Sequence, residues 1–134
     1  MECVDKVRDT TESHDRCTVV EVMGRRAGYL ALNAGIAVGA TAILIPEIEF
    51  DIQKDVIERM KRTQLANKKH FLIVVAEGVG VDVTQLAGEI QEKTGVESRA
   101  CILGHIQRGG SPTVQDRVMA TRMGNYAVKE LLMK

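Results

Sequence analysis

Short apolar runs alternate with longer amphipathic segments along the whole chain. Runs typical of strands buried on both faces occupy 18–23, 42–48, 71–76 and 98–103. Segments with helical spacing occupy 2–9, 27–38, 51–67, 82–93 (with Asp82 or Thr84 at its start) and 113–133. This alternation predicts an α/β fold, a Rossmann-like three-layer sandwich in which a mostly parallel sheet is flanked by helices on both faces.

The order of segments is not interrupted by a low-complexity linker or an internal repeat, so we expect one domain over 1–134. The stretch 27–46 carries no charged residue and has the length of a membrane span. Gly28, Asn33 and Gly39 interrupt it, however, and favour a buried helix followed by a buried strand. We therefore expect no membrane segment.

Charge and cysteine content exclude several classes of function. The 18 Lys and Arg residues balance 18 Asp and Glu residues, which argues against a nucleic-acid or membrane-surface partner. Cys3, Cys17 and Cys101 are odd in number and widely spaced, so neither a disulfide framework nor a zinc site is expected. Reduced thiols are typical of a cytoplasmic protein.

Three predicted strands end in a glycine with polar or charged neighbours. Arg25 follows the strand at 18–23, Glu77 follows 71–76, and His105 and Arg108 follow 98–103. Ligands of parallel sheets bind at the carboxyl ends of the strands, where arginine suits an anion and a carboxylate suits sugar hydroxyls. Each residue alone has an ordinary alternative as a solvated loop charge or structural histidine. Together they indicate a phosphorylated polyol as ligand.

The residues at these strand ends also match a known family. The runs Glu-Val-Met-Gly-Arg (21–25), Ala-Glu-Gly (76–78) and Gly-His-Ile-Gln-Arg-Gly-Gly (104–110) resemble the bacterial ATP-dependent 6-phosphofructokinases. The resemblance implies that fructose 6-phosphate is bound by Met23, Gly24, Arg25, Glu77, His105 and Arg108. It directs Arg108 at the 6-phosphate, and it places Arg25 near the phosphoryl group in transit, where a guanidinium stabilises charge.

Two more arginines match those with which the family reaches a neighbouring subunit's substrate. Arg16 and Arg99 lie near the starts of the strands whose far ends carry Arg25 and His105. Seven strand residues separate Arg16 from Met23 by roughly 20 Å, so Arg16 is too distant for the strand-end site of its own chain. A symmetric homo-oligomer, a tetramer in the family, would let both arginines act on a partner's ligand. Ordinary ion pairs are the alternative.

An effector site is a weaker implication of the resemblance. Arg8, Lys68 and Lys69 match positions that bind an effector phosphate in the bacterial enzymes. Thr41 stands where an acidic effector ligand is common, and Ala66 where a basic one is. Lys68 and Lys69 fit equally well as the basic residues that a helix C-terminus favours.

The resemblance covers only the later part of the family's chain. A glycine-rich nucleotide segment and an aspartate motif for the base are not seen, although phosphoryl transfer needs donor, metal and base together. We expect a fragment of a longer two-domain enzyme that uses ATP and Mg²⁺, with no catalytic base, metal or cofactor site of its own and no turnover alone. Pyrophosphate as the donor, and a non-catalytic phosphosugar-binding regulatory module, remain alternatives.

Overall fold

The computed structural model describes residues 1–133, and its centre is a sheet of four parallel strands. The strands are β1 (Cys17–Val22), β2 (Ala42–Leu44), β3 (Phe71–Ala76) and β4 (Ser98–Ile102), in the order β2-β3-β1-β4. Every residue of β3 is buried, as its continuous apolar run predicts. Val19 pairs with Ile73 of β3 on one side and Ala100 of β4 on the other.

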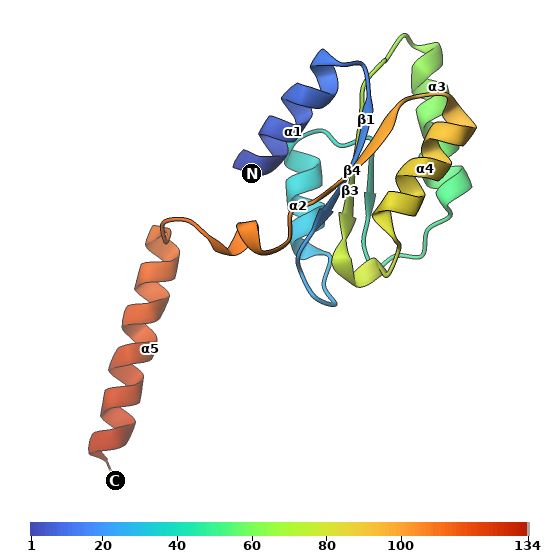
Figure 1. Cartoon of the computed structure of the whole chain (residues 1–134). Helices are drawn as coiled ribbons and strands as arrows, with labels where there is room; N and C mark the ends of the chain where they lie inside the picture. The colour runs from blue at the N-terminus through green and yellow to red at the C-terminus, as the bar shows by residue number, and fades with distance from the viewer. Residues whose placement is uncertain (134) are drawn as a thin grey trace.

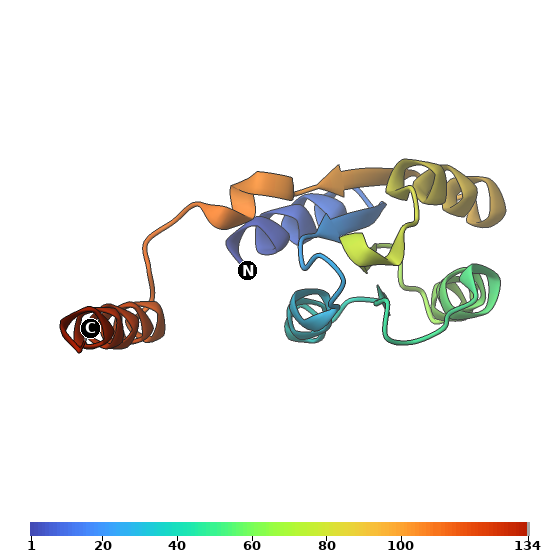
Figure 2. The same ribbon diagram turned by 90° about the horizontal axis from the view of Figure 1, so that it is seen from below.

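Helices cover both faces of the sheet, so the predicted three-layer α/β architecture is confirmed (Figures 1 and 2). α1 (Glu2–Ser13) and α2 (Tyr29–Ala37) cover one face, where Val4 and Ala31 pack with Val20 and Val74. The π-helical turn η1 (Ile52–Glu58), α3 (Arg59–Leu65) and α4 (Val83–Thr94) cover the other. Strand residues alternate between the two cores because successive side chains point to opposite faces.

Local sequence signals explain where the helices begin and end. Asp51 accepts a hydrogen bond from the Lys54 N–H at 3.0 Å and so caps η1. Asp82 caps α4 in the same way, through the Thr84 and Gln85 N–H groups. α4 ends at Gly95, which has the left-handed conformation that glycine adopts without cost.

Two predicted segments differ in extent from the structure. The strand expected over 42–48 ends at Leu44, because Pro46 has no N–H to donate to a neighbouring strand and a turn follows it. The first helix extends to Ser13, four residues beyond the predicted 2–9. The remaining strands and helices form within a few residues of their predicted positions.

The last helix, α5 (Val114–Leu132), begins with a reciprocal cap between Thr113 and Asp116. It has no buried residue and stands apart from the sheet and its helices (Figures 1 and 2). The five-residue stretch 109–113 connects it to the turn η3 (Gly104–Arg108). Among residues 1–133, no helix has the length and apolarity needed to cross a membrane.

Candidate functional site

The carboxyl ends of β1, β3 and β4 meet at one edge of the sheet. β1 leads into Met23-Gly24-Arg25, β3 into the turn η2 (Glu77–Val79), and β4 into η3. The parallel pairing aligns the final residues of the three strands, with Val22 beside Ala76 and Glu21 beside Ile102. The residues that follow the strands are therefore delivered to one place, which we call the strand-end site.

Glu77 joins two of these strand ends. Its Oε1 accepts hydrogen bonds from the backbone N–H groups of Gly24, at 3.1 Å, and of Arg25. These bonds hold the pKa of Glu77 below its ordinary value, with the Arg25 and Gly24 amides as the main causes and the Arg108 and Arg25 charges assisting. Glu77 is thus a carboxylate that orients the loop after β1.

Gln107 joins the third strand end to the first. Its side-chain oxygen accepts a hydrogen bond from the Met23 N–H at 2.8 Å, across 84 residues of sequence. The bond fixes η3 against the end of β1, so Arg108 and Arg25 belong to one connected arrangement. Gln107 lies within the run Gly-His-Ile-Gln-Arg-Gly-Gly (104–110), but no role was predicted for it from the sequence.

Gly78 lets two of the loops approach closely. A Cβ atom at this position would lie 2.3 Å from the carbonyl oxygen of Arg25. A backbone atom cannot yield as a flexible side chain can, so this position requires glycine. The glycine that follows β3, Gly78, is therefore explained by its packing against the loop that contains Arg25.

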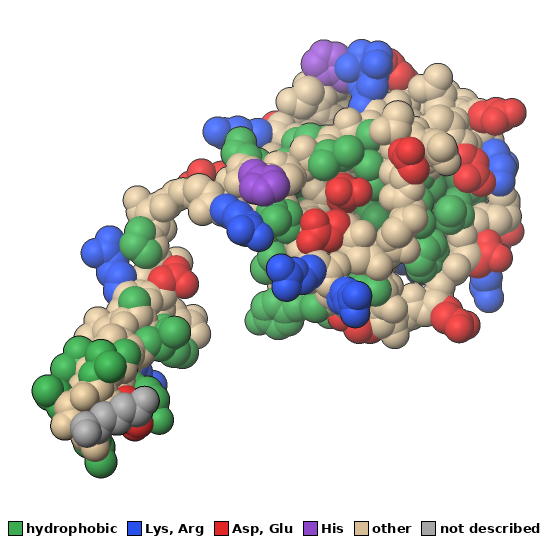
Figure 3. Space-filling model, turned by 60° about the horizontal axis from the view of Figure 1, so that its bottom comes forward, with side chains coloured by type: hydrophobic (Ala, Val, Ile, Leu, Met, Phe, Trp, Pro, Cys, Tyr) green, Lys and Arg blue, Asp and Glu red, His purple; other side chains and the backbone are tan. Residues whose placement is uncertain are grey.

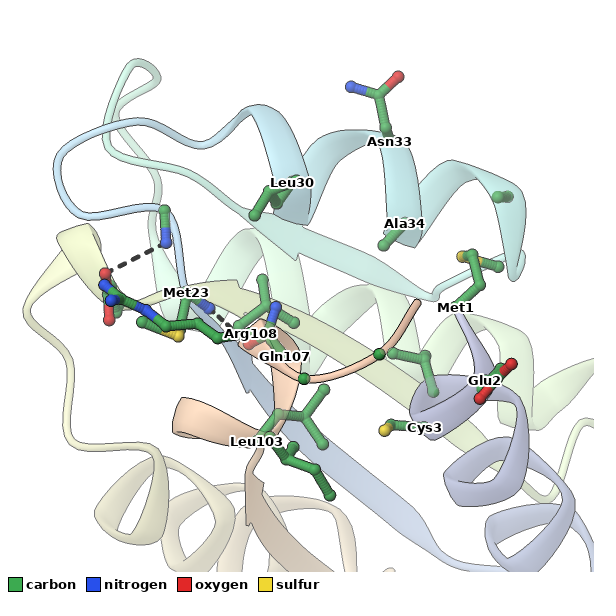
Figure 4. A pocket seen from close by; sticks show the side chains of 18 of the residues that line it. Met1, Glu2, Cys3, Met23, Leu30, Asn33, Ala34, Leu103, Gln107 and Arg108 are labelled. Carbon is green, nitrogen blue, oxygen red and sulfur yellow. Dashed lines mark hydrogen bonds between the residues drawn. The ribbon is translucent and has the colours of Figure 1, made fainter. Parts of the chain in front are cut away.

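A groove of about 1290 Å³ opens from the strand-end site between α1 and α2. Met23, Gln107 and Arg108 lie together at one end of it, and Met1, Glu2 and Cys3 lie at the other (Figure 4). Apolar side chains, among them Leu30, Leu103 and Ile106, form much of the lining. The groove thus offers charged and polar groups at one end and an apolar wall beside them.

Five of the six predicted ligand residues line this groove, namely Met23, Gly24, Arg25, Glu77 and Arg108. His105 is exposed on the same turn as Arg108 and is not among the described residues that line the groove.

Glu21, the penultimate residue of β1, carries a further charge near these loops. Burial, together with the charges of Glu77 and Asp82, raises the pKa of the Glu21 carboxyl group above its ordinary value.

Arg16 and Arg99 lie at the opposite ends of the strands, as their sequence positions predict. Arg16 directly precedes β1, and Arg99 is the second residue of β4. Both form ion pairs with Glu97, at 2.9 Å and 2.8 Å respectively. Glu97 was not singled out from the sequence, because its partnership with Arg16 depends on strands that are distant along the chain.

The three predicted effector residues lie away from the strand-end site. Arg8 donates to the Val38 carbonyl oxygen at 3.5 Å, and Lys68 donates to the Thr41 hydroxyl at 3.4 Å. The Lys68 ammonium also lies 5.9 Å from the centre of the Phe71 ring. Arg8 and Lys68 therefore contact the same segment, 38–41, whereas Lys69 is exposed.

The described residues contain no group of three or more His, Cys, Asp or Glu side chains placed to hold a metal ion. The charged groups that line the strand-end site are the Arg25, Arg108 and Glu77 side chains, which can form hydrogen bonds with anions and hydroxyl groups. Fold and site together define an α/β protein with a groove, lined by two arginines and a glutamate, at the carboxyl ends of its parallel strands, where proteins of this class bind ligands.

Comparison with known proteins gives this class a family. The family model described as Phosphofructokinase matches residues 1–131, and the chain belongs to that family. It is 54% identical over 134 residues to the ATP-dependent 6-phosphofructokinase of Bacillus velezensis, and 53% identical over 132 residues to that of Bacillus subtilis. The matches cover 100% and 98% of this chain, but the chain spans only 41% of each relative.

Solved structures agree with the fold. The phosphofructokinase from Saccharomyces cerevisiae aligns with a TM-score of 0.80 and 40% identity, over 99% of this chain and 19% of that one. The Pichia pastoris phosphofructokinase in the T-state aligns with a TM-score of 0.77 and 37% identity, over 99% and 15% of the two chains. The resemblance predicted from the three motifs is therefore confirmed at the level of the family.

Proposed function

We propose that the chain forms the sugar-phosphate-binding part of a longer, two-domain 6-phosphofructokinase. The whole enzyme transfers a phosphoryl group from ATP to the 1-hydroxyl of fructose 6-phosphate. The observation that carries the proposal is the convergence of Arg25, Glu77 and Arg108 from three separate strand ends on one groove. The names of the curated relatives, which specify ATP, favour ATP over pyrophosphate as the donor.

Each strand-end residue has a role that its chemistry suits. Arg108, with His105 beside it, binds the 6-phosphate through charge-assisted hydrogen bonds. The second oxygen of Glu77 accepts from a sugar hydroxyl while the first holds the Gly24 and Arg25 amides. Met23 and Gly24 line the sugar, and Arg25 stabilises charge on the phosphoryl group during transfer.

Mg²⁺ and the base of the reaction are not assigned to this chain. Mg²⁺ usually binds one or two carboxylates together with substrate phosphates, and in this proposal the donor site and the base lie in the part of the enzyme outside this chain. The strand-end residues of this chain bind and orient the acceptor sugar phosphate.

Two further assignments follow from the same proposal. Arg16 and Arg99 act on the substrate of a neighbouring subunit in a homo-oligomer, since they lie at the sheet edge opposite their own chain's strand-end site. Arg8, Lys68 and Lys69 bind the phosphate of an effector near the segment 38–41.

Calorimetric titration with fructose 6-phosphate tests the proposal. The unchanged chain should bind, and Arg108→Ala should weaken binding by about tenfold or more, because a charge-assisted hydrogen bond contributes about 1.5 kcal/mol or more. Arg122→Ala, on the exposed surface of α5, is the matched control and should bind like the unchanged chain. An affinity that Arg108→Ala leaves unchanged would refute the site assignment, whereas no binding by the unchanged chain would show that the site needs Arg16 and Arg99 of a neighbouring subunit.

A further inference from the structure

The main chain places Arg16 and Glu97 side by side. Arg16 directly precedes β1 and Glu97 directly precedes β4, and the first residues of these strands, Cys17 and Ser98, are partners in the parallel pairing. The Cys17 N–H donates to the Glu97 carbonyl oxygen at 2.9 Å. On its other side, the Arg16 carbonyl oxygen accepts from the Phe71 N–H at 2.8 Å. Both backbones are therefore fixed by the sheet.

The Glu97 carboxylate is divided between two guanidinium groups. Its Oε2 accepts from Arg16 Nε at 2.9 Å, and its Oε1 accepts from Arg99 Nε at 3.2 Å and Arg99 Nη2 at 2.8 Å. Arg99 reaches the carboxylate because Glu97 directly precedes β4, and residues two apart along an extended chain lie on the same side of it. One glutamate thus holds two arginines that come from different strands.

Stability is a weak explanation for this arrangement. The side chains of Arg16, Glu97 and Arg99 are 32%, 43% and 67% exposed, and ion pairs in such surroundings contribute little to folding. The hydrogen bonds from Arg99 and then Arg16 lower the pKa of Glu97, so it is ionised at neutral pH. The three side chains together keep one net positive charge, and what the carboxylate determines is the orientation of the two guanidinium groups.

We propose that Glu97 is a positioning residue that aligns Arg16 and Arg99 as one receptor for a phosphate monoester. This rests on the proposed function, in which the two arginines reach the substrate of a neighbouring subunit. Glu97 occupies only the Nε edge of Arg16, and the fork geometry of a guanidinium leaves its two Nη groups as donors for the ligand. Arg99 likewise keeps its Nη1 group.

Whether neutralising Glu97 tightens or weakens phosphate binding distinguishes a positioning role from a purely electrostatic one. A carboxylate beside an anion site repels the anion, so neutralising a Glu97 that did nothing else would tighten phosphate binding. If Glu97 orients the arginines, its neutralisation leaves two flexible side chains that must be ordered on binding, and phosphate binding weakens. Glu97→Gln keeps the shape of the side chain and removes the charge.

The experiment titrates the chain with inorganic phosphate and follows the Nε–H resonances of Arg16 and Arg99 by NMR. In the unchanged chain, both resonances should shift with one midpoint. In Glu97→Gln, the midpoint should rise about fivefold, in line with the loss of a charge-assisted hydrogen bond, and both Nε–H groups should exchange faster with solvent. Glu92→Gln, on the exposed side of α4, is the control and should change neither property.

An unchanged or lower midpoint in Glu97→Gln overturns the proposal, as does a titration in which the two arginines of the unchanged chain fail to respond together. The Cys17 amide resonance reports whether β1 and β4 remain paired in the variant, since its partner is the main-chain oxygen of Glu97. Arg108→Ala separates this proposal from the function above. That variant should lose fructose 6-phosphate binding at the strand-end site and retain the phosphate response of Arg16 and Arg99.

Discussion

Arg25 adopts a left-handed backbone conformation, with φ of 57°, which costs a non-glycine residue about 1 kcal/mol. The Glu77 carboxylate accepts its N–H and that of Gly24, and thereby holds the loop in this conformation. Strained backbone that is held by neighbouring groups is common where a side chain must be presented to a ligand. At the residue scale, Glu77 therefore has a structural task in addition to the proposed contact with the sugar.

This task predicts a pH dependence for the loop. The folded-state pKa of Glu77 lies below its ordinary value of 4.5, so its hydrogen bonds are complete above that pH and are lost as the pH falls through the depressed pKa. The Arg25 amide resonance, followed by NMR, should therefore titrate with a midpoint below 4.5. Glu77→Gln should abolish this titration. A midpoint of the Arg25 amide resonance at or above pH 4.5 would contradict the assigned hydrogen bonds.

Sequence reasoning identified the strand-end residues because each directly follows an apolar run, and the direction of a parallel strand is enough to place them. It missed Glu97, which meets Arg16 across 81 residues of chain. That contact depends on which strands are neighbours in the sheet, and periodicity within a segment carries no information about strand order. The bond from Met23 to Gln107 was missed for the same reason.

At the scale of elements, the turn after β3 packs directly on the loop after β1, through Gly78 and the Arg25 carbonyl oxygen. The helix α4 contains another glycine, Gly88, where an added Cβ would meet nothing within 4 Å. Close packing therefore requires glycine at position 78, whereas position 88 of the helix has room for a side chain.

Alanine substitutions at these two glycines should have opposite effects. Gly78→Ala should lower the free energy of unfolding by about 1–3 kcal/mol, because the added methyl group displaces backbone. Gly88→Ala should raise the free energy of unfolding by up to about 1 kcal/mol, because alanine favours a helix over glycine. Urea unfolding measures both, and destabilisation of equal size in the two variants would show that Gly78 has no special contact.

The fold class followed from the alternation of elements, whereas some boundaries did not. Pro46 signalled the end of a strand, but the position of the last paired residue, Leu44, depends on β3 alone as neighbour. The segment from Asp51 was predicted as one helix and instead begins with the π-helical turn η1 before α3. Apolar spacing reports which face is buried and does not distinguish the hydrogen-bond pattern of a single turn.

At the scale of the whole molecule, α5 has an apolar sequence typical of a buried helix, yet its side chains are exposed. Apolar residues occur from its first turn to its last, and those that are more than half exposed include Val114, Val118, Met119, Met123, Val128, Leu131 and Leu132. Figure 3 shows hydrophobic side chains over much of the visible surface of this helix. A helix that is apolar on much of its circumference is typical of a buried element, and an exposed apolar surface of this size promotes association.

Shortening the chain to end at Gly110 should therefore leave the folding of the sheet and helices α1 to α4 unchanged and reduce self-association. None of the residues in α5 is buried, so its loss should alter the free energy of unfolding by no more than about 0.5 kcal/mol. Sedimentation velocity at matched concentrations should show a smaller associated fraction than in the longer chain. The double substitution Met123→Glu and Leu131→Glu is the control, because it retains the helix and removes apolar surface, and it should reduce association in the same way. A large loss of stability on shortening would instead mean that α5 packs on the sheet and its helices in solution.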